Sequence, residues 1–157
     1  MKVVIGGTFS QLHAGHLALL RKAFEMGDYV YIGLTKDSYA KSRKPGQKIL
    51  SYAERKRKLV QVVKVLGKEF SIMPLSDRFG PSVTGDFDAI VVSEETYPIA
   101  LKVNKIRKEK GLKLLKIVKI KYVLAEDSLP ISSSRIASGE IDKYGKLHEK
   151  NKKVDSS

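Results

Sequence analysis

The chain has 157 residues, 42% of them hydrophobic and 30% charged, which is enough for one ordinary domain with a proper core and too little for two. It has no cysteine, so disulfides, thiolate metal sites and thiol nucleophiles are excluded, and no apolar run reaches the length of a signal segment or membrane span, so we expect a cytoplasmic protein. A formal net charge of +13 at pH 7 indicates either an anionic partner, such as a phosphorylated ligand, nucleic acid or an acidic membrane surface, or only a heavily solvated surface.

Apolar, β-branched runs alternate with longer segments of helical spacing along the first half of the chain. Residues 2–5 are a predicted buried strand, and a loop leads from it to a helix over residues 15–26. Residues 29–35 are the second predicted strand, and residues 36–48 form a polar loop dense in lysine and arginine. Residues 51–66 form the next helix, which a capping box starts.

The same alternation continues toward the C-terminus. We predict a strand over residues 69–75, a loop over 76–87, a strand over 89–93, a helix over 98–110, a strand over 113–124 and a short helix that opens at 132–134. Helices that separate continuously apolar strands favour a parallel sheet covered on both faces. The fold class is therefore α/β: a Rossmann-like three-layer α/β/α sandwich with a five-stranded parallel sheet, in one domain over residues 1–145 with a charged tail over residues 146–157.

The stretch GGTFSQLHAGH, residues 6–16, follows the first strand, and this fold binds ligands at the carboxyl ends of its strands. Its two leading glycines let the backbone turn sharply and bring bare N–H groups against a ligand. His13 and His16 lie at a helix start, where unpaired N–H groups and the helix dipole attract phosphate. Thr8 adds a hydroxyl, so the corner suits phosphoryl groups, although a plain turn and a histidine cap would produce the same pattern.

A second candidate corner is ISSSRI, residues 131–136. Its serines can cap a helix and offer hydroxyl and N–H groups, and Arg135 adds a delocalised charge with a fork of donors. Alone, this stretch is as typical of a plain helix cap as of a binding site. Paired with the first corner across a cleft, it indicates the other half of a triphosphate clamp.

Both corners resemble the nucleotidylyltransferase superfamily. The first is similar to its Gly-Thr-Phe-Asp-x-x-His-x-Gly-His stretch, with Ser10 in place of the aspartate. The second is similar to its Ile-Ser-Ser-Thr/Ser-x-x-Arg or Ile-Ser-Ser-Thr/Ser-Arg stretch near the C-terminus. The two motifs stand in the right order, and the resemblance covers residues 2–145.

Further stretches resemble one family within that superfamily, the archaeal and eukaryotic type of phosphopantetheine adenylyltransferase. They are VVSEETY at residues 91–97 with Asn104 and Arg107, IGLTKDSYAKSRK at residues 32–44, and SYAERKRKL at residues 51–59, which places Arg55 at the arginine of the family's helix start. One departure is Pro98 and Ile99, where many relatives have glycine after the SEET turn.

The resemblance implies transfer of the adenylyl group of ATP to 4'-phosphopantetheine, giving 3'-dephospho-coenzyme A and pyrophosphate. The acceptor phosphate is already negative at neutral pH, so the reaction needs in-line placement and charge neutralisation rather than a strong base. Mg²⁺ would be carried by ATP, and we expect no metal bound by the protein itself. We also expect a monomer, with neither nucleic acid nor a membrane as partner.

The resemblance also implies a role for each site residue. We assign catalysis to His16, Thr8, Lys41 and Arg135, with His16 on the α-phosphate in the transition state. The ATP-binding set is Gly7, Thr8, His13, His16, Ser132, Ser133, Ser134 and Arg135. The acceptor-phosphate set is Thr8, Lys41 and Lys44, with Lys36 and Arg43 as competing candidates.

Other functions remain open at this point. A related nucleotidylyltransferase could use flavin mononucleotide, nicotinamide mononucleotide or glycerol 3-phosphate as its acceptor. A basic nucleic-acid-binding protein would use the loop at residues 36–48 and the tail as its contacts, but that loop holds only Tyr39 as an aromatic. A sensor that binds nucleotide without turnover would be compatible with Ser10.

Overall fold

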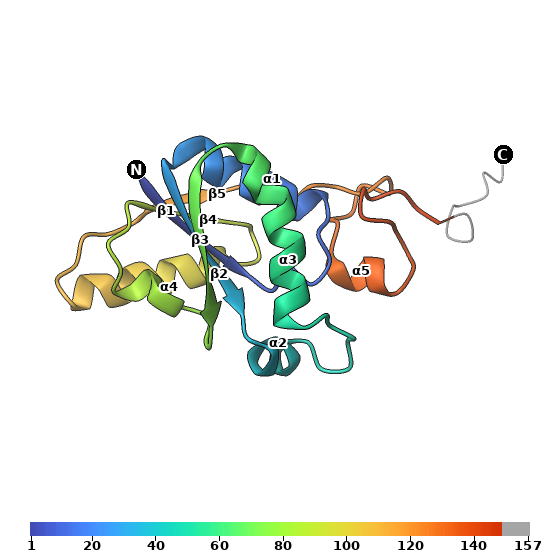
Figure 1. Cartoon of the computed structure of the whole chain (residues 1–157), viewed down its shortest axis with the longest axis horizontal. Coiled ribbons are helices and arrows are strands. Elements are labelled where there is room, and N and C mark those ends of the chain that lie inside the picture. Colours follow the sequence, from blue (N-terminus) through green and yellow to red (C-terminus); the bar gives the residue numbers. More distant parts are fainter. Residues whose placement is uncertain (149–157) are drawn as a thin grey trace.

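The computed structural model describes residues 1–148, and it contains one all-parallel sheet in the order β3-β2-β1-β4-β5 (Figure 1). The strands are β1 (Lys2–Gly7), β2 (Tyr29–Thr35), β3 (Glu69–Leu75), β4 (Ala89–Val92) and β5 (Lys116–Lys119). The helices are α1 (Ala14–Met26), α2 (Asp37–Arg43), α3 (Tyr52–Val63), α4 (Tyr97–Glu109) and α5 (Ser133–Ala137), with 3₁₀ turns η1 (Lys64–Leu66) and η2 (Gly80–Val83).

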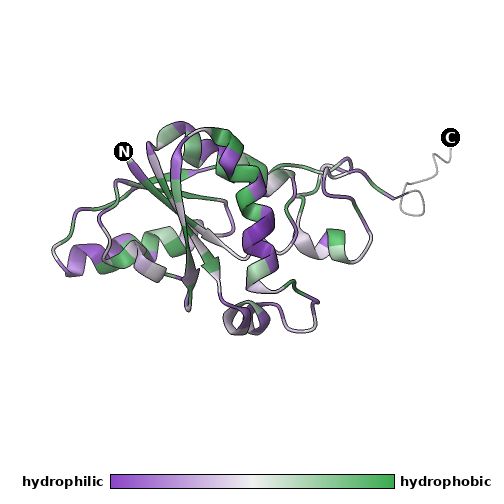
Figure 2. Cartoon of the chain, in the orientation of Figure 1, coloured by the Kyte–Doolittle hydropathy of each residue, from purple (hydrophilic) through white to green (hydrophobic). Residues whose placement is uncertain are grey.

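Two apolar clusters cover the two faces of the sheet. On one face, α1 and α3 pack through Leu20, Phe24 and Leu59 onto alternate strand residues such as Val3. On the other face, α4 packs through Val103 and its neighbours onto the intervening strand residues. Figure 2 shows hydrophobic residues along the central strands and hydrophilic ones alternating with them on the helices. The predicted Rossmann-like α/β sandwich is confirmed.

The strand order reverses between β1 and β4. The register that joins β1 to β2 runs from Lys2 to Gly7, whereas the register that joins β1 to β4 covers Val3 and Val4. The carboxyl ends of β1 and β4 therefore separate, and a ligand can enter between them. This is the edge to which the first glycine-containing corner is attached.

The prediction of a polar loop over residues 36–48 is partly wrong, because residues Asp37–Arg43 form α2. Asp37 lies in the first turn and Lys41 and Arg43 in the last, an order of charges that complements the helix dipole. Ala40 is fully buried beneath the helix. One small apolar contact and a favourable charge order are thus enough to form a short helix in this charged stretch.

The fifth strand is shorter than the predicted residues 113–124, and side chains of α4 bind the backbone just before its start. The Asn104 amide bonds both the N–H and the carbonyl of Leu115, and Arg107 Nε donates to the Lys113 carbonyl at 2.7 Å. These groups are unavailable to a sheet ladder. Residues Lys116–Lys119 pair with β4, and the Ile120 N–H donates a last hydrogen bond to the Val92 carbonyl at 2.9 Å.

Residues 121–148 leave the sheet and form a segment that we call the C-terminal strap, which carries α5. It has a small apolar cluster of its own around Ala125, Ile131 and Ile141. The predicted tail begins at residue 146, yet the Leu147 N–H donates to Glu126 at 2.9 Å and its side chain packs on that cluster. Residues 149–157 of the tail lie outside the described residues. No helix within residues 1–148 combines the length and apolar character needed to cross a membrane.

Candidate active site

A cleft of about 260 Å³ lies where the ends of β1 and β4 separate, and the C-terminal strap forms its opposite wall. Both corners singled out from the sequence line it. The predicted site residues among its lining are Gly7, Thr8, His13, His16, Lys44, Ser132, Ser133 and Ser134. Lys41 and Arg135 do not line it.

His13 and His16 cap the start of α1 for each other. His13 Nδ1 accepts the backbone N–H groups of Gly15 at 3.0 Å and of His16 at 3.4 Å, while His16 Nδ1 accepts the backbone N–H of His13 at 3.3 Å. The two rings stack with centroids 3.8 Å apart. Because each Nδ1 is an acceptor, the proton of each neutral ring is on Nε2, which is then a donor.

The fold keeps both histidines neutral at physiological pH. Burial, with the charge of Lys44 nearby, lowers the pKa of His13 to about 4. Burial also lowers the pKa of His16 to about 3, and repulsion from His13 and Lys44 adds to the shift. The pair therefore offers polar N–H donors in the absence of an anion, and an anion in the cleft would raise both pKa values.

Thr8 is held from behind by a buried arginine on α3. Arg55 is 1% exposed, and its Nη1 donates to the Thr8 carbonyl at 2.9 Å and to Thr35 Oγ1 at 3.2 Å. Its Nη2 donates to the Thr35 carbonyl at 2.8 Å and to Asp37 at 3.1 Å. Thr35 Oγ1 in turn donates to Thr8 Oγ1 at 3.1 Å. Arg55 thus fixes the end of β2 and the loop after β1 together.

Sequence reasoning placed Arg55 in a family motif but gave it no function, and it missed Thr35. Both are buried polar residues, at 1% exposure each, in positions where the pattern suggested only a helix face and a strand end. The sequence did contain a signal for Arg55, because it stands on the inward face of the predicted helix. A charged side chain there is rarely buried unless it is paired, so the position indicates a buried polar contact.

The basic residues after β2 divide into two groups. Arg43 and Lys44 line the cleft, whereas Lys36 and Lys41 are exposed and lie outside its lining. Burial lowers the pKa of Lys44, an effect that Glu95, which also lines the cleft, opposes. The structure thus brings Lys44 to the histidines and leaves Lys41 on the surface.

The serines of the second corner start α5 at the cleft. Ser132 Oγ caps the helix by accepting the Arg135 N–H at 3.3 Å, and Ser133 is buried. Ser134 Oγ accepts a hydrogen bond from Gln47 Nε2 at 2.9 Å, which joins the strap to the loop that follows α2. The two motifs, which lie far apart in the sequence, therefore line one cleft.

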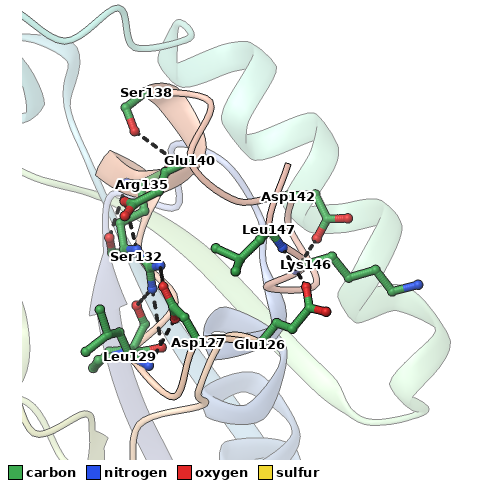
Figure 3. Close-up of polar contacts among 11 residues, drawn as sticks. Glu126, Asp127, Leu129, Ser132, Arg135, Ser138, Glu140, Asp142, Lys146 and Leu147 are labelled. Carbon is green, nitrogen blue, oxygen red and sulfur yellow. Dashed lines mark hydrogen bonds and ion pairs between the residues drawn. The ribbon is translucent and has the colours of Figure 1, made fainter. Parts of the chain in front are cut away.

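Arg135 itself is turned into the strap (Figure 3). Its Nε bonds Glu140 at 2.9 Å, its Nη2 bonds Asp127, and its Nη1 bonds the Pro130 carbonyl at 2.9 Å. These contacts span residues 127–140 and fix the loop that presents the serines. In this structure the guanidinium supports the second corner rather than lining the cleft.

Two further hollows border the cleft. A small pocket of about 80 Å³ shares Gly6, Gly7, Arg43 and Thr96 with it and continues toward Leu75 and Ile99. A broad groove of about 1270 Å³ shares Phe9, His13 and Ser134 with it on the opposite side. The cleft therefore has a narrow, largely apolar extension and a wide, open one.

Comparisons with known proteins agree with this arrangement. The sequence model of the cytidylyltransferase-like family matches residues 4–139. A phosphopantetheine adenylyltransferase of Methanosarcina barkeri is 48% identical over 151 residues, 93% of this chain and 92% of that protein. One from Pyrococcus horikoshii is 47% identical over 146 residues, 92% of each chain.

Solved structures share the architecture. A crystal structure of a protein of unknown function from Archaeoglobus fulgidus has a TM-score of 0.71 and 38% sequence identity, covering 76% of this chain and 89% of its own. A pantoate-beta-alanine ligase from Francisella tularensis has a TM-score of 0.61 at 13% identity, covering 88% of this chain and 66% of its own. At that identity the second likeness concerns the fold alone.

Proposed function

This chain belongs to the cytidylyltransferase-like family and, within it, to the phosphopantetheine adenylyltransferases, and from that membership we propose that it transfers the adenylyl group of ATP to 4'-phosphopantetheine. The products are 3'-dephospho-coenzyme A and pyrophosphate, and the place of the enzyme is coenzyme A synthesis. The observation that carries the proposal is the single cleft lined by both phosphate-binding corners, in a chain about half identical to such enzymes along nearly its whole length.

Catalysis rests on placement and on neutral donors. The acceptor phosphate attacks the α-phosphorus of ATP in line, and the bond from the α-phosphorus to the oxygen that bridges to the β-phosphate breaks. Nε2–H of His16 donates to an α-phosphate oxygen, where negative charge builds up, and His13 donates beside it. Thr8 and Lys44 hold the acceptor phosphate, and the Gly7 backbone allows close approach. Lys41, whose side chain is exposed, contributes only long-range attraction.

The leaving pyrophosphate faces the C-terminal strap. Ser132, Ser133 and Ser134 offer hydroxyl and N–H donors to the β- and γ-phosphates. Arg135 acts on these phosphates through the loop that it holds, or directly once its contacts with Asp127 and Glu140 open. The broad groove beyond Ser134, which carries Lys48, Lys58 and Lys143, gives the released pyrophosphate a path to solvent.

The remaining features of the site suit the acceptor and the metal. The small pocket between β1 and α4, with its apolar walls, takes the pantetheine arm of the acceptor. Mg²⁺ bound by the nucleotide supplies charge neutralisation at the phosphates. Among residues 1–148 no group of three or more metal-ligating side chains occurs, and Glu95, which lines the cleft, can bind the ion's water shell.

We place this enzyme in the cytoplasm as a monomer that binds ATP and 4'-phosphopantetheine and not nucleic acid.

Pyrophosphate release tests the proposal. Wild-type protein with ATP, Mg²⁺ and 4'-phosphopantetheine should turn over, whereas flavin mononucleotide, nicotinamide mononucleotide and glycerol 3-phosphate should not replace the acceptor. His16→Ala should lower kcat by about 100-fold or more, as the loss of one transition-state donor does. Arg21→Ala, an exposed position on the same helix, should match wild type. Turnover with another acceptor alone would change the substrate, and none with any acceptor would favour a nucleotide sensor.

A further inference from the structure

A chain of hydrogen bonds with one direction runs from α3 to the cleft. It begins at Arg55 Nη1, passes through Thr35 Oγ1 at 3.2 Å and ends at Thr8 Oγ1, a further 3.1 Å away. All three residues are buried, with Arg55 and Thr35 1% exposed and Thr8 8%. Of the three, Thr8 lines the cleft, and Thr35 lines the adjoining small pocket.

The direction of these hydrogen bonds follows from which groups can donate a proton and which can accept one. A guanidinium has donors and no acceptor and stays charged at any physiological pH, so Thr35 Oγ1 must accept from Arg55. Within residues 1–148, the contacts of Thr35 Oγ1 are with Arg55 and Thr8, so Thr8 Oγ1 is the acceptor available to the Thr35 proton. The positive charge of Arg55 favours the same polarity, because it orients the oxygen toward itself and the proton away.

Thr8 is left with its own proton to donate. Its oxygen accepts from Thr35 on the buried side, and the residue borders the cleft on the other. A hydroxyl can either accept from or donate to its neighbours, and only the donating form helps to bind a phosphate oxygen. We propose that Arg55 and Thr35 are positioning residues, which fix the Thr8 hydroxyl as a donor toward the acceptor phosphate before the substrate arrives.

This inference rests on the proposed function, because it assigns Thr8 to the acceptor phosphate of that reaction. Preorganisation of a donor avoids its reorientation at each turnover, which is how a hydrogen bond contributes most to a rate. Arg55 also holds the Thr8 carbonyl and the start of α3, where its Nε bonds the Leu50 carbonyl at 2.9 Å. Its removal would disturb the fold, so Thr35 is the residue at which the relay can be tested.

The test is a double-mutant cycle on the reaction with 4'-phosphopantetheine. Thr35→Val keeps the shape of the side chain and removes the hydroxyl, and we expect kcat/KM for the acceptor to fall about 10-fold, as for one net hydrogen bond. Thr35→Ser should retain the relay and stay within about 2-fold of wild type. In a Thr8→Val background, Thr35→Val should change kcat/KM by no more than about 2-fold, because the hydroxyl that it orients is already absent.

Each outcome has a distinct meaning. Loss in Thr35→Val, recovery in Thr35→Ser and no further loss in the double variant would support the relay. Equal losses in the wild-type and Thr8→Val backgrounds would assign Thr35 a role independent of Thr8, in the fold or in the wall of the small pocket, and would overturn the relay, as would full activity of Thr35→Val. Absence of wild-type turnover with 4'-phosphopantetheine would overturn the proposed function, and the relay with it, so the two failures are distinguishable.

Discussion

His13 and His16 each accept the other's backbone N–H through Nδ1, at 3.4 Å and 3.3 Å, so the two histidines that line the cleft also cap its helix. A substitution at either position should therefore change helix capping and the proposed phosphate binding together, unless the new side chain preserves one of them.

His13→Asn separates these two effects. The asparagine side-chain oxygen can accept the N–H groups that His13 now accepts, so the free energy of unfolding should stay within about 1 kcal/mol of wild type. The variant lacks Nε2–H, so kcat should fall about 100-fold. His13→Ala should lose activity to a similar degree and lose about 1 kcal/mol of stability besides. Denaturant unfolding and pyrophosphate release measure the two quantities. Full activity in His13→Asn would show that capping alone is its function.

The stability of the ligand-free protein should depend on pH through the same histidines. Their pKa values, about 4 and about 3, lie below the 6.5 of an unfolded chain, so the unfolded state binds more protons between pH 6.5 and 4. The free energy of unfolding should therefore fall with decreasing pH across that window, by up to about 1.4 kcal/mol per pH unit for each histidine. Denaturant unfolding at pH 7, 6 and 5 measures the slope.

Asp88 contributes to stability in a lower pH window than the histidines do. A hydrogen bond from Lys113 lowers the pKa of Asp88 to about 2, so the stability that this group provides is lost only below about pH 4. His13→Asn should reduce the slope between pH 6.5 and 4. An unchanged slope would mean that His13 is solvated and titrates normally.

Lys44→Ala and Lys41→Ala form a matched pair within one short segment. Lys44 lines the cleft and Lys41 is exposed on α2, so Lys44→Ala should raise KM for 4'-phosphopantetheine by about 10-fold or more, since a charge-assisted hydrogen bond is lost. Lys41→Ala should change KM by less than about 2-fold at physiological salt. The two variants have the same net charge, so equal effects would point to general electrostatic attraction rather than to a specific contact.

Arg135→Ala should loosen the strap and weaken ATP binding. The guanidinium joins Asp127 and Glu140, and without it the serine loop loses its internal support. We expect faster amide exchange over residues 127–140 and a several-fold higher KM for ATP, with Asp127→Asn giving a smaller change of the same sign. Tighter ATP binding in Asp127→Asn would instead show that the freed arginine contacts the phosphates directly.

The sequence predicted the sheet and both corners because their signals are local. Strands β2 and β3 coincide with the predicted residues 29–35 and 69–75. The apolar run of β2 is that of a buried parallel strand, whereas β3 is an edge strand in which only Ile72 and Leu75 are buried. The corners carry motifs whose residue types follow from phosphate chemistry. That they share one cleft follows from the fold, which brings the ends of β1 and β4 and the strap together.

The features that the sequence did not predict depend on contacts between distant residues. The backbone just before β5 is bound by Asn104 and Arg107, which lie on another element, and α2 depends on the burial of Ala40. Which lysine lines the cleft, and the engagement of Arg135 with Asp127, likewise depend on where the chain turns in space. Local propensity contains none of this information.

The small cluster around Ala125, Ile131 and Ile141 gives the strap a core separate from those of the sheet. Its contacts with the rest of the domain include the hydrogen bond from the Ala14 N–H to the Lys143 carbonyl, the bond between Gln47 and Ser134, and the packing of Ala14 on the cluster. A small packed unit opens at a lower free energy than a large one. We therefore expect the strap to open first on heating, so that activity is lost at a temperature at which the sheet is still folded.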